Sequence, residues 1–254
     1  MSVVYLLFNK LQAIFIVFYS REGNMNMQLL QQTIEQIQGI DRQMEEKARN
    51  YTDSLAKPPQ SLGKLESLAI QLSAITGELF PKIDKKAIIV MAADHGVYDE
   101  GVTPNPQSTT VFQTLSFPKG TTGMCTIAKV TNAKVVPVDI GVKEDLPQDA
   151  GVIIKKIKYG TDNMAKGPAM TREEAIQAIE VGIEVATEEI KKGINLIGTG
   201  EMGIGNTTPS AAVLPVFFNR IDVWCICSNY PCCRCDPAKI TISCRDDYRN
   251  LPYV

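Results

Sequence analysis

The chain has 254 residues and a mass of 27.9 kDa, enough for one large domain or two small ones. Apolar residues make up 44% of it and charged residues 21%, which excludes a wholly disordered or collagen-like protein. The net charge of −2 lacks the basic excess typical of nucleic-acid-binding proteins, and a single histidine excludes a metal site built from several histidines. We therefore expect no nucleic-acid partner.

The first segment, residues 1–24, is apolar but interrupted by polar residues within Asn9–Gln12. A membrane-spanning helix needs about 20 predominantly apolar residues, so we expect no membrane partner. The segment also lacks the leading positive charge and the cleavage site of a signal peptide, and we expect a cytoplasmic protein. We interpret it as a β-rich appendage or as a non-native extension, with Met25 and Met27 as alternative starts.

The next segment is predicted to be helical. Met27–Leu55 favours a helix or a pair of helices because apolar residues recur at helical spacing, although Gly39 weakens the pattern. After a break at Lys57–Gln60, Ser61 is expected to cap a short helix at Leu62–Ile75. This helix would expose Lys64 and Glu66 and bury an apolar face made of Leu65, Leu68, Ala69 and Leu72.

From residue 87 onward, apolar strands alternate with helices. Strands are predicted at Ala87–Ala93, Lys134–Ile140, Gly151–Lys158 and Asn195–Gly198. Helices are predicted near Gly123–Val130 and at Thr171–Lys192, where Thr171 and Glu174 form a capping box. This alternation predicts an α/β fold with a parallel sheet, in which ligands bind beyond the carboxyl ends of the strands.

Polar residues stand at three of the predicted strand ends. Asp94 and His95 follow the first strand, Asp139 ends the second, and a glycine-rich loop follows the last. For His95 and Asp139 a structural role is an alternative to a role at the site, because a buried polar side chain is usually hydrogen-bonded to a nearby loop.

The glycine-rich loop, Gly198–Pro209, is the segment that points to chemistry. It holds four glycines in eight residues, and Thr208 is placed to cap a helix that starts at Pro209. A strand, a glycine-rich loop and a helix N-terminus together form a phosphate site, because free backbone N–H groups face the anion. The loop lacks both the Walker pattern and the dinucleotide fingerprint. Glu201 is unexpected beside a phosphate, because a carboxylate repels an anion. We expect it to contact a ribose hydroxyl or a developing positive charge on the sugar, with a solvated loop residue as the alternative.

At this loop the sequence resembles the nicotinate-nucleotide–dimethylbenzimidazole phosphoribosyltransferase family. The resemblance covers about Asn26 to Leu214 and rests on ordered blocks of sequence. These blocks are Lys57-Pro58, Ser61–Glu66, Ala93–Val97, Gly101–Thr103, Gly167–Thr171 and Gly200–Thr208.

The resemblance implies a function for this chain. Phosphoribose passes from nicotinate mononucleotide to 5,6-dimethylbenzimidazole, giving α-ribazole 5′-phosphate and nicotinate, for the lower ligand of cobalamin. It implies no metal and no cofactor, and it suggests a homodimer. The alternative is a catalytically impaired remnant or a nucleotide-binding module.

The resemblance also assigns residues. Nucleotide binding falls to Gly200, Glu201, Gly203, Ile204, Gly205, Asn206 and Thr207, base binding to Thr103 and Gln113, and a supporting role to Asp94 and His95. It implies a Rossmann-like parallel sheet flanked by helices, with an N-terminal helical segment in a smaller domain.

We expect four parts in the chain. They are an extension outside the family (1–24), a helical segment of the small domain (25–80), an incomplete α/β domain (81–216) and a cysteine-rich tail outside the family (217–254). The family continues with a second glycine-rich loop and a Gly-Gly-x-Glu-Ile-Ala block, whose glutamate is taken to be the catalytic base. Nothing after Leu214 resembles it, so Glu201 is the expected substitute. The tail is interpreted as frameshifted, with a zinc site or a native tail as alternatives.

Overall fold

The structure is a computed structural model that describes residues 28–218. The expected extension at residues 1–24 and all but the first two residues of the expected tail lie outside this range. The chain divides into two compact units. Within residues 28–218, one unit contains the residues up to Lys86 together with Thr187–Ile197, and the other contains Ala87–Ala186 and the residues from Gly198 onward. The predicted domain boundaries stay a prediction.

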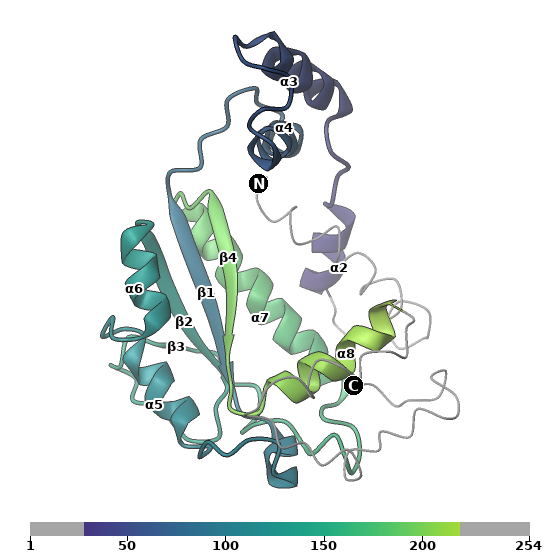
Figure 1. The fold of residues 1–254 in the computed structure, drawn as a ribbon. Coiled ribbons are helices and arrows are strands. Elements are labelled where there is room, and N and C mark those ends of the chain that lie inside the picture. Colours follow the sequence, from purple (N-terminus) through teal and green to yellow (C-terminus); the bar gives the residue numbers. More distant parts are fainter. Residues whose placement is uncertain (1–27, 219–254) are drawn as a thin grey trace. The chain divides into compact units, whose positions relative to one another are not determined.

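The described part of the first unit begins with three helices (Figure 1). The pair expected in Met27–Leu55 is confirmed as α2 (Gln28–Glu35) and α3 (Arg42–Ser54). The Asp41 side chain accepts a hydrogen bond from the Met44 N–H and so caps α3, while its own N–H donates to the carbonyl of Ala74. α3 packs against α4 (Lys64–Thr76).

The prediction for α4 was wrong in its start and in its buried face. The helix begins after Gly63, which has φ 55°, and no side chain caps it. Glu66 is buried because its carboxylate pairs with the Lys57 ammonium at 2.9 Å and accepts the Leu62 N–H. Leu65 is 66% exposed as a consequence. The buried residues of α4 are Glu66, Ile70, Ser73 and Ala74.

The second unit is built on a four-stranded parallel sheet, which confirms the α/β fold. Its strands are β1 (Lys86–Ala93), β2 (Ala133–Gly141), β3 (Ile153–Ile154) and β4 (Leu196–Met202), in the order β3-β2-β1-β4. In the register of β2 and β3, Val138 pairs with Ile153. β3 is much shorter than predicted, and β4 runs four residues further than predicted.

Helices lie between the strands of this sheet in sequence, and one more follows β4 (Figure 1). They are η1 (Gly96–Glu100, a 3-10 helix), α5 (Thr109–Ser116), α6 (Gly123–Val130), α7 (Arg172–Lys191) and α8 (Thr207–Phe218). The capping box of α7 is confirmed, because the Thr171 N–H donates to Glu174 Oε2 and the Glu174 N–H to Thr171 Oγ1. α6 has the predicted bounds, whereas α5 was missed.

Side chains of β1 point alternately to the two faces of the sheet, and different helices cover each face. Val90 and Ala92 belong to clusters that include residues of α5, α6 and the loop after β2. Met91 points to the opposite face, where its methyl group would lie 4.0 Å from a Cβ atom at Gly182 of α7. Met202, at the end of β4, packs against both clusters and so holds the carboxyl end of that strand against the core.

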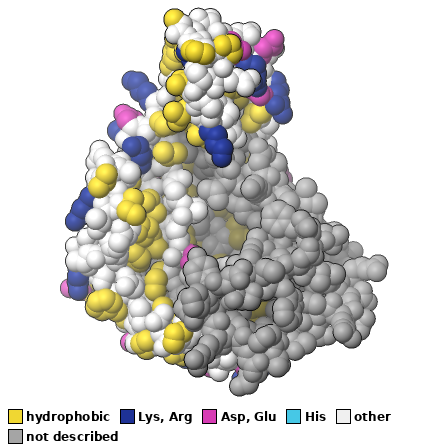
Figure 2. All heavy atoms as spheres, in the orientation of Figure 1, with side chains coloured by type: hydrophobic (Ala, Val, Ile, Leu, Met, Phe, Trp, Pro, Cys, Tyr) yellow, Lys and Arg dark blue, Asp and Glu magenta, His cyan; other side chains and the backbone are white. Residues whose placement is uncertain are grey.

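Some apolar side chains of the second unit stay at its surface. Phe112 of α5 and Ile127 and Val130 of α6 are each more than 60% exposed. Figure 2 shows apolar side chains gathered over the region where Figure 1 draws these two helices. Among the described residues, no helix combines the length and the apolar character that crossing a membrane requires.

Asp139 shapes the turn after β2. Its buried Oδ1 accepts the N–H groups of Gly141 and Val142 at 3.1 and 2.8 Å. Its Oδ2 lies 3.5 Å from the ammonium of Lys156, which also donates to the carbonyls of Val142 and Glu144. The structural alternative for Asp139 is therefore favoured, since each carboxylate oxygen faces a group of the protein.

Replacing Asp139 should strongly destabilise the protein. Asp139→Ala removes the acceptor of two buried N–H groups and leaves the Lys156 ammonium without its buried partner, so we expect a loss of about 3–5 kcal/mol in the free energy of unfolding. Urea denaturation measures it. Asp145→Ala is the control, because the Asp145 side chain also contacts Lys156 but is 80% exposed, and it should cost less than about 1 kcal/mol. Equal losses in the two variants would contradict this role.

Candidate functional site

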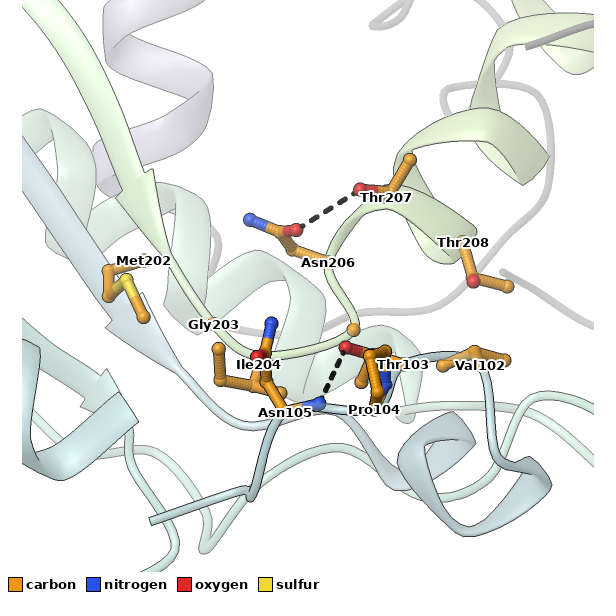
Figure 3. A pocket seen from close by; sticks show the side chains of 11 residues that line it. Val102, Thr103, Pro104, Asn105, Met202, Gly203, Ile204, Asn206, Thr207 and Thr208 are labelled. Atoms are coloured by element: carbon orange, nitrogen blue, oxygen red, sulfur yellow. Dashed lines mark hydrogen bonds between the residues drawn. The ribbon is translucent and has the colours of Figure 1, made fainter. Parts of the chain in front are cut away.

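A pocket of about 280 Å³ opens where two segments of the second unit meet (Figure 3). One segment is Val102–Asn105, which follows η1. The other is Met202–Thr208, which joins the end of β4 to the start of α8. The pocket therefore lies at the carboxyl end of a parallel strand and at a helix N-terminus, where α/β folds bind ligands.

The true loop is shorter than the predicted one. Gly198 and Gly200 are part of β4, and a side chain at Gly200 would contact Val90 of the neighbouring strand at 3.4 Å. Thr208 does not cap α8 as predicted, because the helix already begins at Thr207 and the carbonyl of Asn206 accepts the N–H of Ser210. The connecting loop is Gly203–Asn206, and Gly200 lies outside the pocket lining.

Gly203 lets the loop approach the end of β1. A Cβ atom at this position would overlap the carbonyl oxygen of Ala93 and lie 2.6 Å from Nε2 of His95, so only glycine fits. Burial lowers the pKa of the His95 imidazole below its usual value, against the opposing effect of the Asp94 charge. A neutral imidazole therefore packs against the loop and supports it.

Asp94 holds the neighbouring loops together. Its side chain is 1% exposed, and Oδ2 accepts the N–H of Lys143 at 2.8 Å. Its backbone N–H donates to the carbonyl of Gly141, and its carbonyl accepts the N–H of Thr161. Oδ1 is buried and accepts no hydrogen bond from the described residues. Asp94 thus connects the end of β1 to the loops after β2 and β3.

The backbone N–H groups of the pocket loop alternate between bonded and free. Ile204 donates to Oγ1 of Thr110 on α5 at 3.1 Å, Asn206 to the carbonyl of Gly203, and Thr208 to the carbonyl of Gly205. Within residues 28–218, the N–H groups of Gly205 and Thr207 have no such partner. Both residues line the pocket, and a helix N-terminus adds partial positive charge there. The arrangement is suited to an anion.

Glu201 is the carboxylate nearest to this loop in sequence, and it is tied to it by a hydrogen bond. The side-chain amide of Asn206 donates to Glu201 Oε1, and Asn206 Oδ1 accepts the hydroxyl of Thr207 at 3.4 Å. Glu201 is exposed as a residue, but the surrounding protein partly desolvates its carboxyl group. This desolvation disfavours the charged form and raises the pKa of the group. The Asn206 hydrogen bond acts in the opposite direction.

The structure brings together most, but not all, of the residues singled out in the sequence. Thr103 lines the pocket, and its hydroxyl oxygen accepts the N–H of Asn105 (Figure 3). Gln113 lies half-buried on α5 and does not line the pocket. Sequence reasoning missed Thr110 and Asn105. The only hint of Thr110 is its place in a Thr-Thr pair between the two predicted base-binding residues, Thr103 and Gln113.

The sequence and the fold place the chain in a known family. The model of the phosphoribosyltransferase family matches residues 37–224, so the chain belongs to that family. Its curated relatives are named nicotinate-nucleotide–dimethylbenzimidazole phosphoribosyltransferase, which confirms the resemblance stated above.

Two relatives illustrate the match in sequence. That of Alkaliphilus metalliredigens is 63% identical over 193 residues, which are 76% of this chain and 55% of the relative. That of Clostridium perfringens strain 13 is 50% identical over 186 residues, 73% of this chain and 51% of the relative. The chain thus spans about half the length of the curated relatives it matches.

A solved structure agrees with the fold. The crystal structure of nicotinate-nucleotide–dimethylbenzimidazole phosphoribosyltransferase from Thermus thermophilus has a TM-score of 0.69 and 40% sequence identity. The match covers 71% of this chain and 55% of that one.

A methyl group at Gly203 should disrupt the pocket. Gly203→Ala forces the loop away from Ala93 and His95, so we expect the free energy of unfolding to fall by about 1–3 kcal/mol and the Gly203 N–H environment to change. Urea denaturation and ¹⁵N NMR measure these effects. Gly167→Ala is the matched control, because no atom lies within 4 Å of its added methyl group. If Gly203→Ala behaves like the control, the close approach is wrong.

Removing the Asn206 amide should raise the pKa of Glu201 further. In Asn206→Ala the hydrogen bond that lowers this pKa is lost, whereas the burial that raises it remains. A ¹³C NMR titration of the Glu201 carboxyl group measures the shift. Asn195→Ala is the control, since it removes the same kind of amide–carboxylate bond from Asp84 and should leave Glu201 unchanged. A fall of the Glu201 pKa in Asn206→Ala would contradict this account.

Proposed function

We propose that this protein transfers phosphoribose from nicotinate mononucleotide to 5,6-dimethylbenzimidazole, giving α-ribazole 5′-phosphate and nicotinate. The names of the relatives support both substrates, and their match favours the transferase over a nucleotide-binding module or an impaired remnant. The observation that carries the proposal is the pocket between Val102–Asn105 and Met202–Thr208. Its lining includes Gly205 and Thr207, whose N–H groups have no hydrogen-bond partner within residues 28–218, and Asn206, whose side chain binds the carboxylate of Glu201.

In this proposal, the phosphate lies against the start of α8. The N–H groups of Gly205 and Thr207 donate to it, and the helix dipole favours its charge. Gly205 has φ 90°, and Val102 would contact its Cβ at 3.3 Å, so glycine keeps the backbone open to the ligand. Gly203, Ile204 and Asn206 shape the same loop.

The base is proposed to occupy the side of the pocket formed by the other segment. Val102 and Pro104 supply apolar surface for a flat aromatic ring, and the Thr103 side chain lies in the same lining. Gln113 lies on α5 outside the pocket lining, and in this proposal it contributes to base binding only from that neighbouring position. Asp94 and His95 support the loops around the pocket. Gly200 contributes by letting β4 pack closely against β1.

Glu201 is proposed to act on the reacting centre. Nicotinate leaves readily because its ring nitrogen is cationic in the nucleotide, and the transition state places positive charge on the ribose. A carboxylate stabilises that charge, and it accepts the proton that the attacking imidazole ring must lose from its other nitrogen. Because burial raises the pKa of Glu201, its carboxylate is a stronger base than a fully solvated one. None of these steps requires a metal or a cofactor.

Two further properties belong to the proposal. The family resemblance suggests a homodimer and a cytoplasmic location. Size-exclusion chromatography coupled to light scattering measures the first, and a mass near twice 27.9 kDa is the expected result.

The reaction itself gives the test. Glu201→Gln removes the base and the negative charge, so we expect formation of α-ribazole 5′-phosphate to fall by at least about 10²-fold, as followed by liquid chromatography. Glu173→Gln is the control, because Glu173 is an exposed glutamate in the first turn of α7 and should change the rate little. An unchanged rate in Glu201→Gln would refute the role of Glu201, and a wild-type chain without any transfer would refute the proposed function.

A further inference from the structure

Thr110 is a buried hydroxyl residue that contacts the pocket loop, although no sequence pattern singles it out. It lies in the first turn of α5 with no exposed surface, and its own N–H donates to the carbonyl of Gln107. Its Oγ1 accepts the N–H of Ile204 at 3.1 Å, across 94 positions of sequence. A threonine hydroxyl buried in this way is unusual unless it has a partner, and here its partner belongs to the loop between β4 and α8.

This bond determines which way the loop presents its backbone. In a tight loop, successive peptide groups point in different directions, so fixing the N–H of Ile204 toward α5 constrains the next one. The N–H of Gly205, which follows it, has no partner in the described chain and lies in the pocket lining. Without an acceptor at Thr110, the part-buried Ile204 N–H would lack a hydrogen bond or would have to turn toward the pocket.

We propose that Thr110 is a positioning residue for the phosphate-binding loop. By binding the Ile204 N–H it directs the N–H groups of Gly205 and Thr207 at the substrate's phosphate. It does not touch the substrate, because it is absent from the lining of the pocket. This inference rests on the function proposed above and adds to it a residue on a different element, α5.

The same helix supplies a matched control. Thr114 lies one turn further along α5, is buried to the same extent, and donates its hydroxyl to the carbonyl of Thr110 at 2.7 Å. Thr110→Val and Thr114→Val each exchange a buried hydroxyl for a methyl group of the same shape on one helix. Only Thr110→Val removes a bond to the pocket loop.

The experiment compares the two variants in the full chain by amide hydrogen exchange and by titration with nicotinate mononucleotide. In Thr110→Val we expect the Ile204 amide to lose its protection and the dissociation constant to rise by about tenfold or more. The apparent KM for the nucleotide should rise while kcat changes little, because the phosphate is bound equally in the ground and transition states. Thr110→Ser keeps the hydroxyl and should restore both readouts, and Thr114→Val should match the wild type in both.

Each contrary result has a separate meaning. If the wild-type chain binds the nucleotide and Thr110→Val binds it as tightly as Thr114→Val does, the role of Thr110 is overturned. The same conclusion follows if Thr110→Ser fails to restore binding. If the wild-type chain binds no nucleotide while the Ile204 amide is protected, the proposed function fails instead, and the phosphate role of Thr110 fails with it.

Discussion

The contact between Gly203 and the end of β1 is the constraint on which the pocket depends. Because Gly203 has no side chain, the loop after β4 lies against the carbonyl of Ala93 and the ring of His95. The ends of two neighbouring parallel strands therefore converge. Asp94 fixes the β1 end in turn, since its buried carboxylate and backbone hold the loops after β2 and β3. A larger residue at position 203 would separate β4 from this arrangement.

The close approach of the β1 and β4 ends determines which backbone N–H groups of the pocket loop are left without a partner in the described chain. With Gly203 in place, the Ile204 N–H meets Thr110 of α5, and the next residues turn into the first turn of α8. The donors that have no partner within residues 28–218 belong to Gly205 and Thr207, which line the pocket together with Val102–Asn105. The proposed anion site thus depends on packing around two glycines, Gly203 and Gly205. It needs no basic side chain, in agreement with a lining that, among the described residues, contains no lysine or arginine.

Local patterns predicted much of this fold, and contacts between distant residues explain what they missed. The α/β alternation, the bounds of α6 and the capping box of α7 depend on neighbours in sequence, and they were predicted. The end of β4 was predicted four residues too early, at Gly198, because Gly200 reads as a loop residue until Ile88 and Val90 of β1 are seen beside it. The burial of Glu66 depends on Lys57, and the role of Thr110 depends on Ile204. At the site, Thr103 and the Gly203–Thr207 part of the predicted segment line the pocket, whereas Gly200 and Glu201 do not, and their roles in binding stay predictions. Which N–H groups are hydrogen-bonded could be seen only in the folded backbone.

The most direct test of the central claim is a ¹⁵N NMR titration of the wild-type chain with nicotinate mononucleotide. We predict saturable shifts of the Gly205 and Thr207 amide resonances to lower field, the direction expected when an N–H group donates to a phosphate oxygen. The Ile204 amide should stay protected from exchange throughout, because its partner is Thr110 rather than the ligand. Saturable binding that leaves the Gly205 and Thr207 amides unperturbed would contradict the account, since the phosphate would then be bound elsewhere.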